Sequence, residues 1–354
     1  MKRALLVFQQ FGRSEEPFLL MNHPLRILVT GATGAVGPRV VGSLVEAGYG
    51  IRTLSLGPPS RGLWPEGIEA QLGDITDHSV VHTAMQGIDV VIHLAALLHI
   101  VNPPPSLQPE YERINVGGTA AVVEAARQAG VVRMVFFSTI AVYGDSAGGI
   151  LTEDSPARPD SFYAQTKLAA ERIVLAAKRA DGRPLGTVLR LGAVYGGRIR
   201  GNYRRLLIAL ARGRFAPIGP GTNRRTLVYD KDVGRAAVLA AVHPDAAGRI
   251  FNVTDGQIHT MNAVIGILCD ALGRRPPLLT LPVNIIRGLA GILEDGARLC
   301  GLSSPVVRAT IDKYTEDAAV DGRRFCEQLG FVPRYDLASG WRETVAEMRQ
   351  SGDL

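Results

Sequence analysis

A glycine-rich loop between an apolar strand and a helix constrains the fold more than any other feature of this 354-residue sequence. The loop reads Gly31-Ala-Thr-Gly34-Ala-Val-Gly37, after the apolar run 26–30 and before the helical pattern 36–47. Glycines permit a tight turn and a close approach of backbone to pyrophosphate, and the helix N-terminus adds free N–H groups. The G-x-x-G-x-x-G spacing alone is a weak signal, but this strand–turn–helix context indicates a dinucleotide-binding loop.

Strand and helix patterns alternate along the first 195 residues. Strands are expected at 26–30, 51–56, 89–95, 133–138 and 186–191, and helices at 36–47, 78–86, 110–129 and 160–180. Several strands are continuously apolar, which is typical of a parallel sheet covered on both faces. We predict an α/β fold, a Rossmann-like doubly wound parallel sheet with a smaller C-terminal α/β substrate-binding region. The expected division is an extension at 1–24, a dinucleotide-binding domain at 25–195, a substrate region at 196–345 with some segments returning to the sheet, and a tail at 346–354.

The ends and the charge balance narrow the class of protein. The first 24 residues do not resemble a signal peptide, because polar residues interrupt the apolar run that such a peptide needs. Met21 is an alternative start. Lys and Arg outnumber Asp and Glu by 39 to 33, and the net charge of +6 suits small anions at least as well as nucleic acid. We predict no nucleic-acid partner and no metal site.

The cysteines and the apolar segments bear on the compartment. Cys269, Cys300 and Cys326 are far apart, which favours free thiols in the cytoplasm. No run reaches the roughly 18 apolar residues of a membrane span. The most apolar late segment, 278–293, is broken by Pro282 and Arg287; an ordinary packed helix is favoured there over a membrane-surface role.

The end of the second strand bears on the choice of cofactor. Ser55 stands where NAD-binding proteins often carry an acid for the ribose hydroxyls, so nothing there rejects a 2′-phosphate. Arg61 either pairs with such a phosphate or is a solvated loop charge. Asp74 follows a third strand and either accepts a hydrogen bond from an adenine or caps the next helix, a role for which Asp77 is an equal candidate.

Tyr163 and Lys167 lie four residues apart in a predicted helix and therefore on one face. A nearby ammonium favours the phenolate and lowers the pKa of the tyrosine, which can then exchange a proton with an alcohol or carbonyl. Ser138 and Thr139, at the end of a strand, can orient the same oxygen. A chance Tyr-x-x-x-Lys pair on a helix surface would explain the spacing equally well in isolation.

Seven segments together remove that ambiguity: VTGATGAVG (29–37), LGDITD (72–77), VIHLAA (91–96), INVGGT (114–119), FFSTIAVYG (136–144), YAQTK (163–167) and LRLGAVYG (189–196). The chain resembles the extended short-chain dehydrogenase/reductases over residues 25–345, and more narrowly their nucleotide-sugar epimerase/dehydratase branch. The resemblance implies NAD or NADP as cofactor, NAD being weakly favoured, and a homodimer.

The resemblance also implies roles for individual residues. Tyr163 would be the acid/base, Lys167 its partner, and Thr139 the catalytic hydroxyl. The cofactor would contact Gly31, Thr33, Gly34, Ala35, Val36, Gly37, Ser55, Arg61, Asp74, Ile75, Leu94, Ala95, Ala96, Asn115, Ser138, Tyr163 and Lys167. The substrate would contact Ser138, Thr139, Asn202, Arg204 and Arg225, the last three in arginine-rich segments suited to a diphosphate.

Three functions fit these patterns. The first is an NAD(P)-dependent nucleotide-sugar 4-epimerase of the UDP-hexose type. The second is an NAD(P)H-dependent reductase of a 4-keto nucleotide sugar or another ketone, which the missing acid at Ser55 suits. The third is a non-enzymatic dinucleotide sensor, since fold alone does not give function; the complete Tyr163, Lys167 and Thr139 set argues against it.

Overall fold

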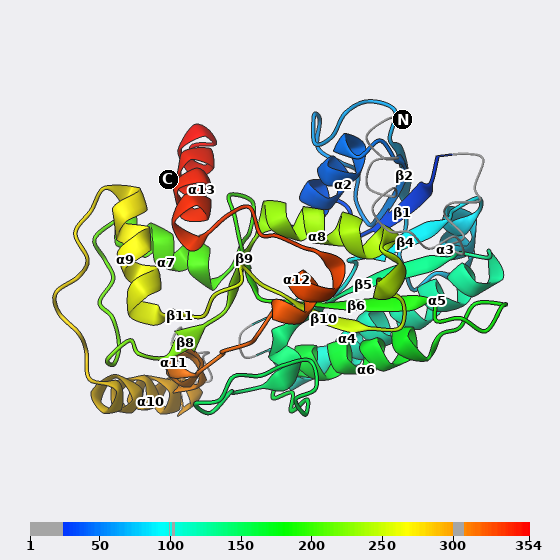
Figure 1. Ribbon diagram of the computed structural model, residues 1–354. Coiled ribbons are helices and arrows are strands. Elements are labelled where there is room, and N and C mark those ends of the chain that lie inside the picture. The colour runs from blue at the N-terminus through cyan, green and yellow to red at the C-terminus, as the bar shows by residue number, and fades with distance from the viewer. Residues whose placement is uncertain (1–23, 99, 101–102, 300–307) are drawn as a thin grey trace.

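A seven-stranded parallel sheet forms the centre of the structure (Figure 1). The computed structural model describes residues 24–98, 100, 103–299 and 308–354, so the expected extension lies outside the described residues except for Pro24. The strand order is β3-β2-β1-β4-β5-β6-β10, and every neighbouring pair is parallel. The strands are β1 (Arg26–Thr30), β2 (Gly50–Ser55), β3 (Glu69–Leu72), β4 (Val90–His93), β5 (Arg133–Thr139), β6 (Gly186–Leu191) and β10 (Ile250–Val253). The predicted doubly wound fold is confirmed.

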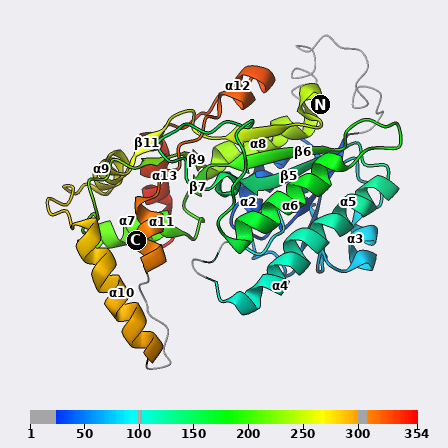
Figure 2. The ribbon, with the colours of Figure 1, turned by 90° about the horizontal axis from the view of Figure 1, so that it is seen from below.

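Helices cover both faces of this sheet, as its continuously apolar strands require. Strand side chains alternate between two separate cores. One face carries α2 (Gly37–Glu46), α8 (Asp230–Val242) and α12 (Arg323–Leu329); the other carries α3 (His78–Met85), α5 (Thr119–Gln128) and α6 (Phe162–Ala176). Figure 2 shows α5 and α6 side by side across the second face.

The predicted helix 110–129 is not a uniform α-helix. It consists of α4 (Gln108–Tyr111), a π-helical segment at Glu112–Gly118 and α5. The π-helical turns widen the helix where it passes the end of β4, and such turns occur frequently at functional sites.

The second half of the chain builds a smaller region around Trp341. Its helices are α7 (Asn202–Ala211), α9 (Met261–Leu272) and α13 (Leu337–Gln350), with the short pairs β7 (Ala193–Tyr195)–β9 (Leu227–Tyr229) and β8 (Arg224–Arg225)–β11 (His259–Thr260). Beside them lie α10 (Val283–Leu299) and α11 (Arg308–Thr315). Because α13 continues to Gln350, most of the expected tail at 346–354 is helix instead, and the buried Met348 anchors it.

The chain changes direction in the sheet between β1 and β4. From β1 it proceeds outward to β2 and β3, then returns to β4 on the other side and continues to β5 and β6. Helices leaving neighbouring strands at such a switch point diverge and leave a crevice at the carboxyl ends of the strands, where ligands bind in open α/β sheets.

Candidate active site

A cavity of about 520 Å³ lies at the carboxyl ends of β1, β2, β4, β5 and β6. It brings together residues that the sequence spreads over more than 130 positions. The predicted residues that line it are Gly31, Thr33, Gly34, Ala35, Val36, Gly37, Ser55, Asp74, Ile75, Leu94, Ala95, Ala96, Ser138, Thr139, Tyr163 and Lys167. The cavity therefore joins the glycine loop to the proposed proton-transfer residues.

The glycine loop has the shape that its sequence predicts. Gly31 has φ +71°, and a Cβ there would lie 2.7 Å from the backbone nitrogen of Ala95. A Cβ on Gly37 would collide with the Ala32 carbonyl, so this glycine allows α2 to start close against β1. The backbone is thus exposed to the cavity at the N-terminus of α2, an arrangement suited to a phosphate group.

At the end of β2, Ser55 is buried and its Oγ accepts a hydrogen bond from the Thr33 backbone nitrogen at 3.2 Å. This serine therefore holds the glycine loop by a hydrogen bond to its backbone. Arg61 is exposed in the following turn and does not line the cavity, contrary to the expectation that it contacts the cofactor. Besides Lys167, the cavity is lined by the cation Arg200, which lies in the arginine-rich stretch 198–214 but is not among the residues expected at the site.

The two aspartates after β3 have separate roles. Asp77 is the N-cap of α3 and accepts hydrogen bonds from the backbone nitrogens of Ser79 and Val80. Asp74 lines the cavity, and its Oδ1 accepts a hydrogen bond from the Thr76 backbone nitrogen at 2.9 Å. Since Asp77 supplies the helix cap, Asp74 keeps carboxylate surface toward the cavity.

Tyr163 and Lys167 lie on the first turns of α6, next to Thr139 at the end of β5. Ser161 caps the helix by accepting a hydrogen bond from the Ala164 nitrogen, which fixes the turn that carries Tyr163. The Thr139 Oγ1 accepts a hydrogen bond from the Ala141 nitrogen at 3.1 Å, so its own proton can be donated into the cavity. These three side chains occupy one end of the cavity.

The electrostatics of this pair differ from the sequence-based expectation. Burial, with a smaller contribution from the neighbouring Tyr111, raises the pKa of the Tyr163 phenol to about 12. Burial lowers the pKa of the Lys167 amine to about 7. The Lys167 Nζ lies 4.0 Å from the centre of the Phe136 ring. Burial thus dominates the pKa of the phenol in this structure, and the lowering expected from an adjacent ammonium stays a prediction.

Ser138 has a structural partner as well as a place in the cavity wall. Its Oγ donates a hydrogen bond to the buried carboxylate of Glu171, which forms a 2.6 Å ion pair with Arg190. The serine donates its proton within the protein, and its expected contacts with cofactor and substrate stay a prediction that only its oxygen, as an acceptor, could fulfil. Of the two neighbouring hydroxyls, Thr139 is the one suited to the reacting oxygen.

Asn115, like Arg61, does not line the cavity. It is buried, its Oδ1 accepts a hydrogen bond from the Leu97 nitrogen at 2.7 Å, and its Nδ2 donates to Leu97 O and to Thr166 Oγ1. Asn115 holds the backbone of Leu97, which lines the cavity, and its own contact with a cofactor stays a prediction.

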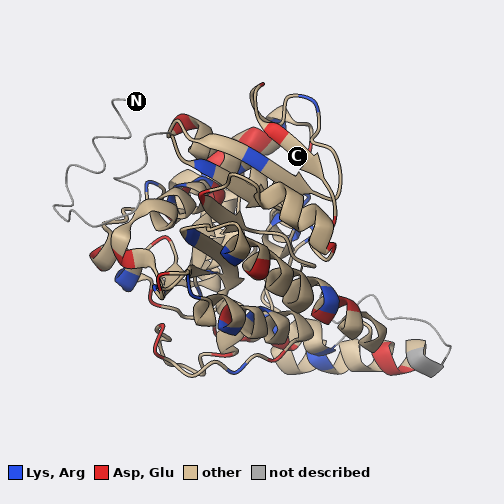
Figure 3. Ribbon diagram, turned by 90° about the vertical axis from the view of Figure 1, so that its right-hand side faces the viewer, with Lys and Arg blue, Asp and Glu red and all other residues tan. Residues whose placement is uncertain are grey.

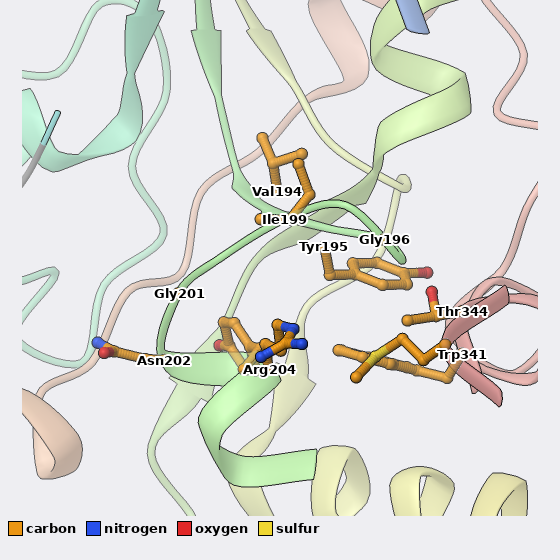
Figure 4. Close-up of a pocket in the computed structure, with 11 residues that line it drawn as sticks. Val194, Tyr195, Gly196, Ile199, Gly201, Asn202, Arg204, Trp341 and Thr344 are labelled. Carbon is orange, nitrogen blue, oxygen red and sulfur yellow. The ribbon is translucent and has the colours of Figure 1, made fainter. Parts of the chain in front are cut away.

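The three expected diphosphate ligands lie elsewhere. Asn202 and Arg204 line a separate small pocket against Tyr195 and Trp341; Figure 4 shows Asn202 turned away from these rings. Arg204 forms a 2.8 Å ion pair with Asp353. None of these groups faces the large cavity.

Arg225 serves the backbone of α11. Its Nη2 donates hydrogen bonds to the carbonyls of Lys313 and Tyr314. Carbonyls in the last turn of a helix lack partners within the helix, which explains why a guanidinium is held there. The sequence identified these arginines but could not show that they bind groups of the protein itself, Asp353 for Arg204 and carbonyls of α11 for Arg225.

Comparison with known proteins agrees with this geometry. Residues 27–254 match the NAD dependent epimerase/dehydratase family. A 3β-hydroxysteroid dehydrogenase/Δ5→4-isomerase from Mycobacterium tuberculosis is 31% identical over 74% of this chain and 73% of its own length. The N-acetyl-α-D-glucosaminyl-diphospho-ditrans,octacis-undecaprenol 4-epimerase of Escherichia coli O157:H7 is 28% identical, covering 90% of this chain and 94% of that protein.

A solved structure, MoeE5 in complex with UDP-glucose and NAD, is 30% identical with a TM-score of 0.72, covering 92% of this chain and 99% of that one. The match covers the glycine loop, Thr139, Tyr163 and Lys167 in a single family profile. The chain belongs to the NAD dependent epimerase/dehydratase family of extended short-chain dehydrogenase/reductases.

Proposed function

We propose that the chain is an NAD(P)-dependent nucleotide-sugar 4-epimerase of the UDP-hexose type. The observation that carries the proposal is that Tyr163, Lys167 and Thr139 share one cavity with the glycine loop. Relatives that act on or bind diphosphate-linked sugars, including the 4-epimerase from E. coli and MoeE5 with UDP-glucose, support this substrate class.

The residues of the cavity fit a dinucleotide. Gly31 and Gly37 allow the tight turn that brings the N-terminus of α2 to the cavity, where a pyrophosphate would bind, and Asp74 lines the same cavity as a carboxylate that could accept a hydrogen bond from an adenine amino group. Ser55 has no carboxylate that would repel a 2′-phosphate or bind the ribose hydroxyls, so NAD and NADP both fit. A bound nicotinamide would take a hydride from the sugar carbon and return it to the other face.

The protein supplies the proton transfer. The Tyr163 phenol oxygen takes the proton of the C4 hydroxyl as the carbon is oxidised and returns it when the ketone is reduced. The Thr139 hydroxyl donates a hydrogen bond to the same sugar oxygen and fixes its position. Burial raises the pKa of Tyr163 to about 12 and therefore disfavours the phenolate that this step needs. A positive charge close to the phenol in the complex with cofactor and substrate has to offset this cost.

One observation favours a second candidate. A tyrosine with a raised pKa is protonated at neutral pH and is ready to donate, which suits reduction of a ketone by NAD(P)H. The absence of an acid at Ser55 suits NADPH in the same reaction. A reductase of a 4-keto nucleotide sugar is therefore the alternative.

The test begins with the dinucleotide. Purified protein is denatured, and any released dinucleotide is identified by chromatography, after which UDP-glucose and UDP-N-acetylglucosamine are assayed for interconversion with their 4-epimers. Stoichiometric NAD with epimerisation supports the epimerase. A protein that turns over only with added NAD(P)H supports the reductase, and a protein that binds neither dinucleotide refutes both.

Two features of the assembly remain proposals. The apolar faces of α5 and α6 are buried against the sheet, so a homodimer rests on the family resemblance alone, and light scattering of the purified protein tests it. The thiols of Cys269 and Cys326 are free, and Cys300 lies outside the described residues; free thiols fit a reducing compartment such as the cytoplasm.

A further inference from the structure

Helix α10 has its apolar and polar faces reversed relative to an ordinary surface helix. Ile285, Leu289, Ile292 and Leu293 recur at helical spacing and are all exposed, Ile292 by 71%. The face turned inward contains Ala290 and the charged residues that pair with α11. The ordinary packed helix expected from the sequence is therefore wrong for this segment.

The polar groups of α10 are satisfied within the protein. Arg287 forms a 2.7 Å ion pair with Asp312 of α11, and Arg308 of α11 pairs with Asp295 at 2.6 Å. Gly291 provides room for the Arg308 guanidinium, because a Cβ there would lie 2.5 Å from its Nε. These pairs fix the rotation of α10 so that its uncharged arc points outward.

The apolar surface continues beyond the helix. Leu278 is 98% exposed and Leu279 is also exposed, immediately before α10. The preceding residues, Arg274 and Arg275, are exposed as well. Figure 2 shows α10 projecting from the body of the protein, and in Figure 3 the helix that ends at the grey segment is largely uncharged.

We propose that this surface, comprising Leu278, Leu279, Ile285, Leu289, Ile292 and Leu293 with Arg274 and Arg275 at its edge, docks on the surface of an anionic lipid bilayer. A projecting helix with one uncharged apolar arc can enter the boundary between headgroups and acyl chains, and flanking arginines attract anionic lipids. No helix in the described ranges is long and apolar enough to cross a membrane, so α10 lies in the plane of the bilayer.

A second cavity, of about 800 Å³, lies next to the proposed docking surface. Asp312 of α11 lines it and also pairs with Arg287 of α10. The cavity extends to Ser161 and Phe162, at the start of α6.

The test is sedimentation of the full chain with vesicles, which requires no catalysis and is independent of the proposed function. Vesicles of phosphatidylcholine with phosphatidylglycerol are compared with phosphatidylcholine alone, at low and high salt. We expect binding to the anionic vesicles that weakens with salt. The double variant Ile285→Glu/Ile292→Glu should bind at least ~tenfold more weakly, because the buried apolar area is lost and charge enters the interface.

A matched control adds the same charge elsewhere. Val332 and Ile150 are also exposed apolar residues, 68% and 54% exposed, but lie outside the docking surface, so the double variant Val332→Glu/Ile150→Glu should bind vesicles like the parent. Circular dichroism checks that each variant is folded. Failure of the parent to bind anionic vesicles overturns the proposal. So does a parent dimer that Ile285→Glu/Ile292→Glu converts to monomer without any change in vesicle binding, since the surface would then hold a second copy.

Discussion

Removing the charge of Glu171 should destabilise the protein strongly although the side chain touches no ligand. Glu171 and Arg190 are both almost fully buried and form a 2.6 Å ion pair beneath the cavity floor. Glu171→Gln leaves the Arg190 guanidinium buried without a counter-charge, and breaking a buried pair from one side costs about 3–5 kcal/mol. At roughly 2 °C per kcal/mol for a chain of this size, Tm should fall by about 6–10 °C.

Differential scanning calorimetry measures this effect, and a surface pair provides the control. Glu124 pairs with Arg127 on α5, both about half exposed, and Glu124→Gln should leave Tm within ~2 °C of the parent. The variant Glu171→Leu/Arg190→Met removes both charges and should recover much of the loss, because no buried charge remains unpaired. A Glu171→Gln protein as stable as Glu124→Gln, or a double variant no better than the single one, would refute the reasoning.

Three further outcomes are expected. Tyr163→Phe should lower turnover ~10²–10⁴-fold while the dinucleotide still binds, as measured by steady-state kinetics and fluorescence titration. Gly31→Ala should abolish dinucleotide binding, because the added Cβ would collide with the Ala95 backbone. Gly48 also has a positive φ but open space around it, so Gly48→Ala should lower Tm in thermal unfolding and leave dinucleotide binding intact. His93 is buried between Thr30 and Thr119, and burial lowers its pKa to about 3. As the pH is lowered from about 6.5 to 3, only the unfolded chain takes up the histidine proton, so the free energy of unfolding should decrease over this range. His93→Gln should flatten that part of an acid-unfolding curve.

The sequence predicted the backbone of the site well. The boundaries of the strands before Gly31 and Thr139 and the start of the helix that carries Tyr163 agree with the structure to within two residues, because apolar runs and glycines report local conformation directly. The end of that helix was predicted four residues too late, at 180 instead of Ala176. The parallel sheet with helices on both faces followed from the same patterns. Sixteen expected residues meet in one cavity because the carboxyl ends of parallel strands share one edge.

The partners of polar side chains could not be read in the same way. Arg225 was assigned to a diphosphate, yet it holds the last carbonyls of α11, 88 residues further along the chain. Ser138 donates its proton to Glu171, a partner that the sequence did not reveal. Such pairings depend on tertiary contacts, and a single sequence without an alignment does not reveal them. The pKa of Tyr163 differed for a related reason, because helical spacing gives neighbours but not burial.

The sheet is completed late in the chain. Strand β10 covers the open edge of β6, but it is made about 60 residues after β6. At a synthesis rate of ~5–20 residues per second, the edge of β6 waits for several seconds on the ribosome without its neighbour. An unpaired strand edge is a template for wrong pairing with another chain. The nascent protein is therefore exposed to aggregation during this interval, and a chaperone that shields the β6 edge would act before β10 has emerged.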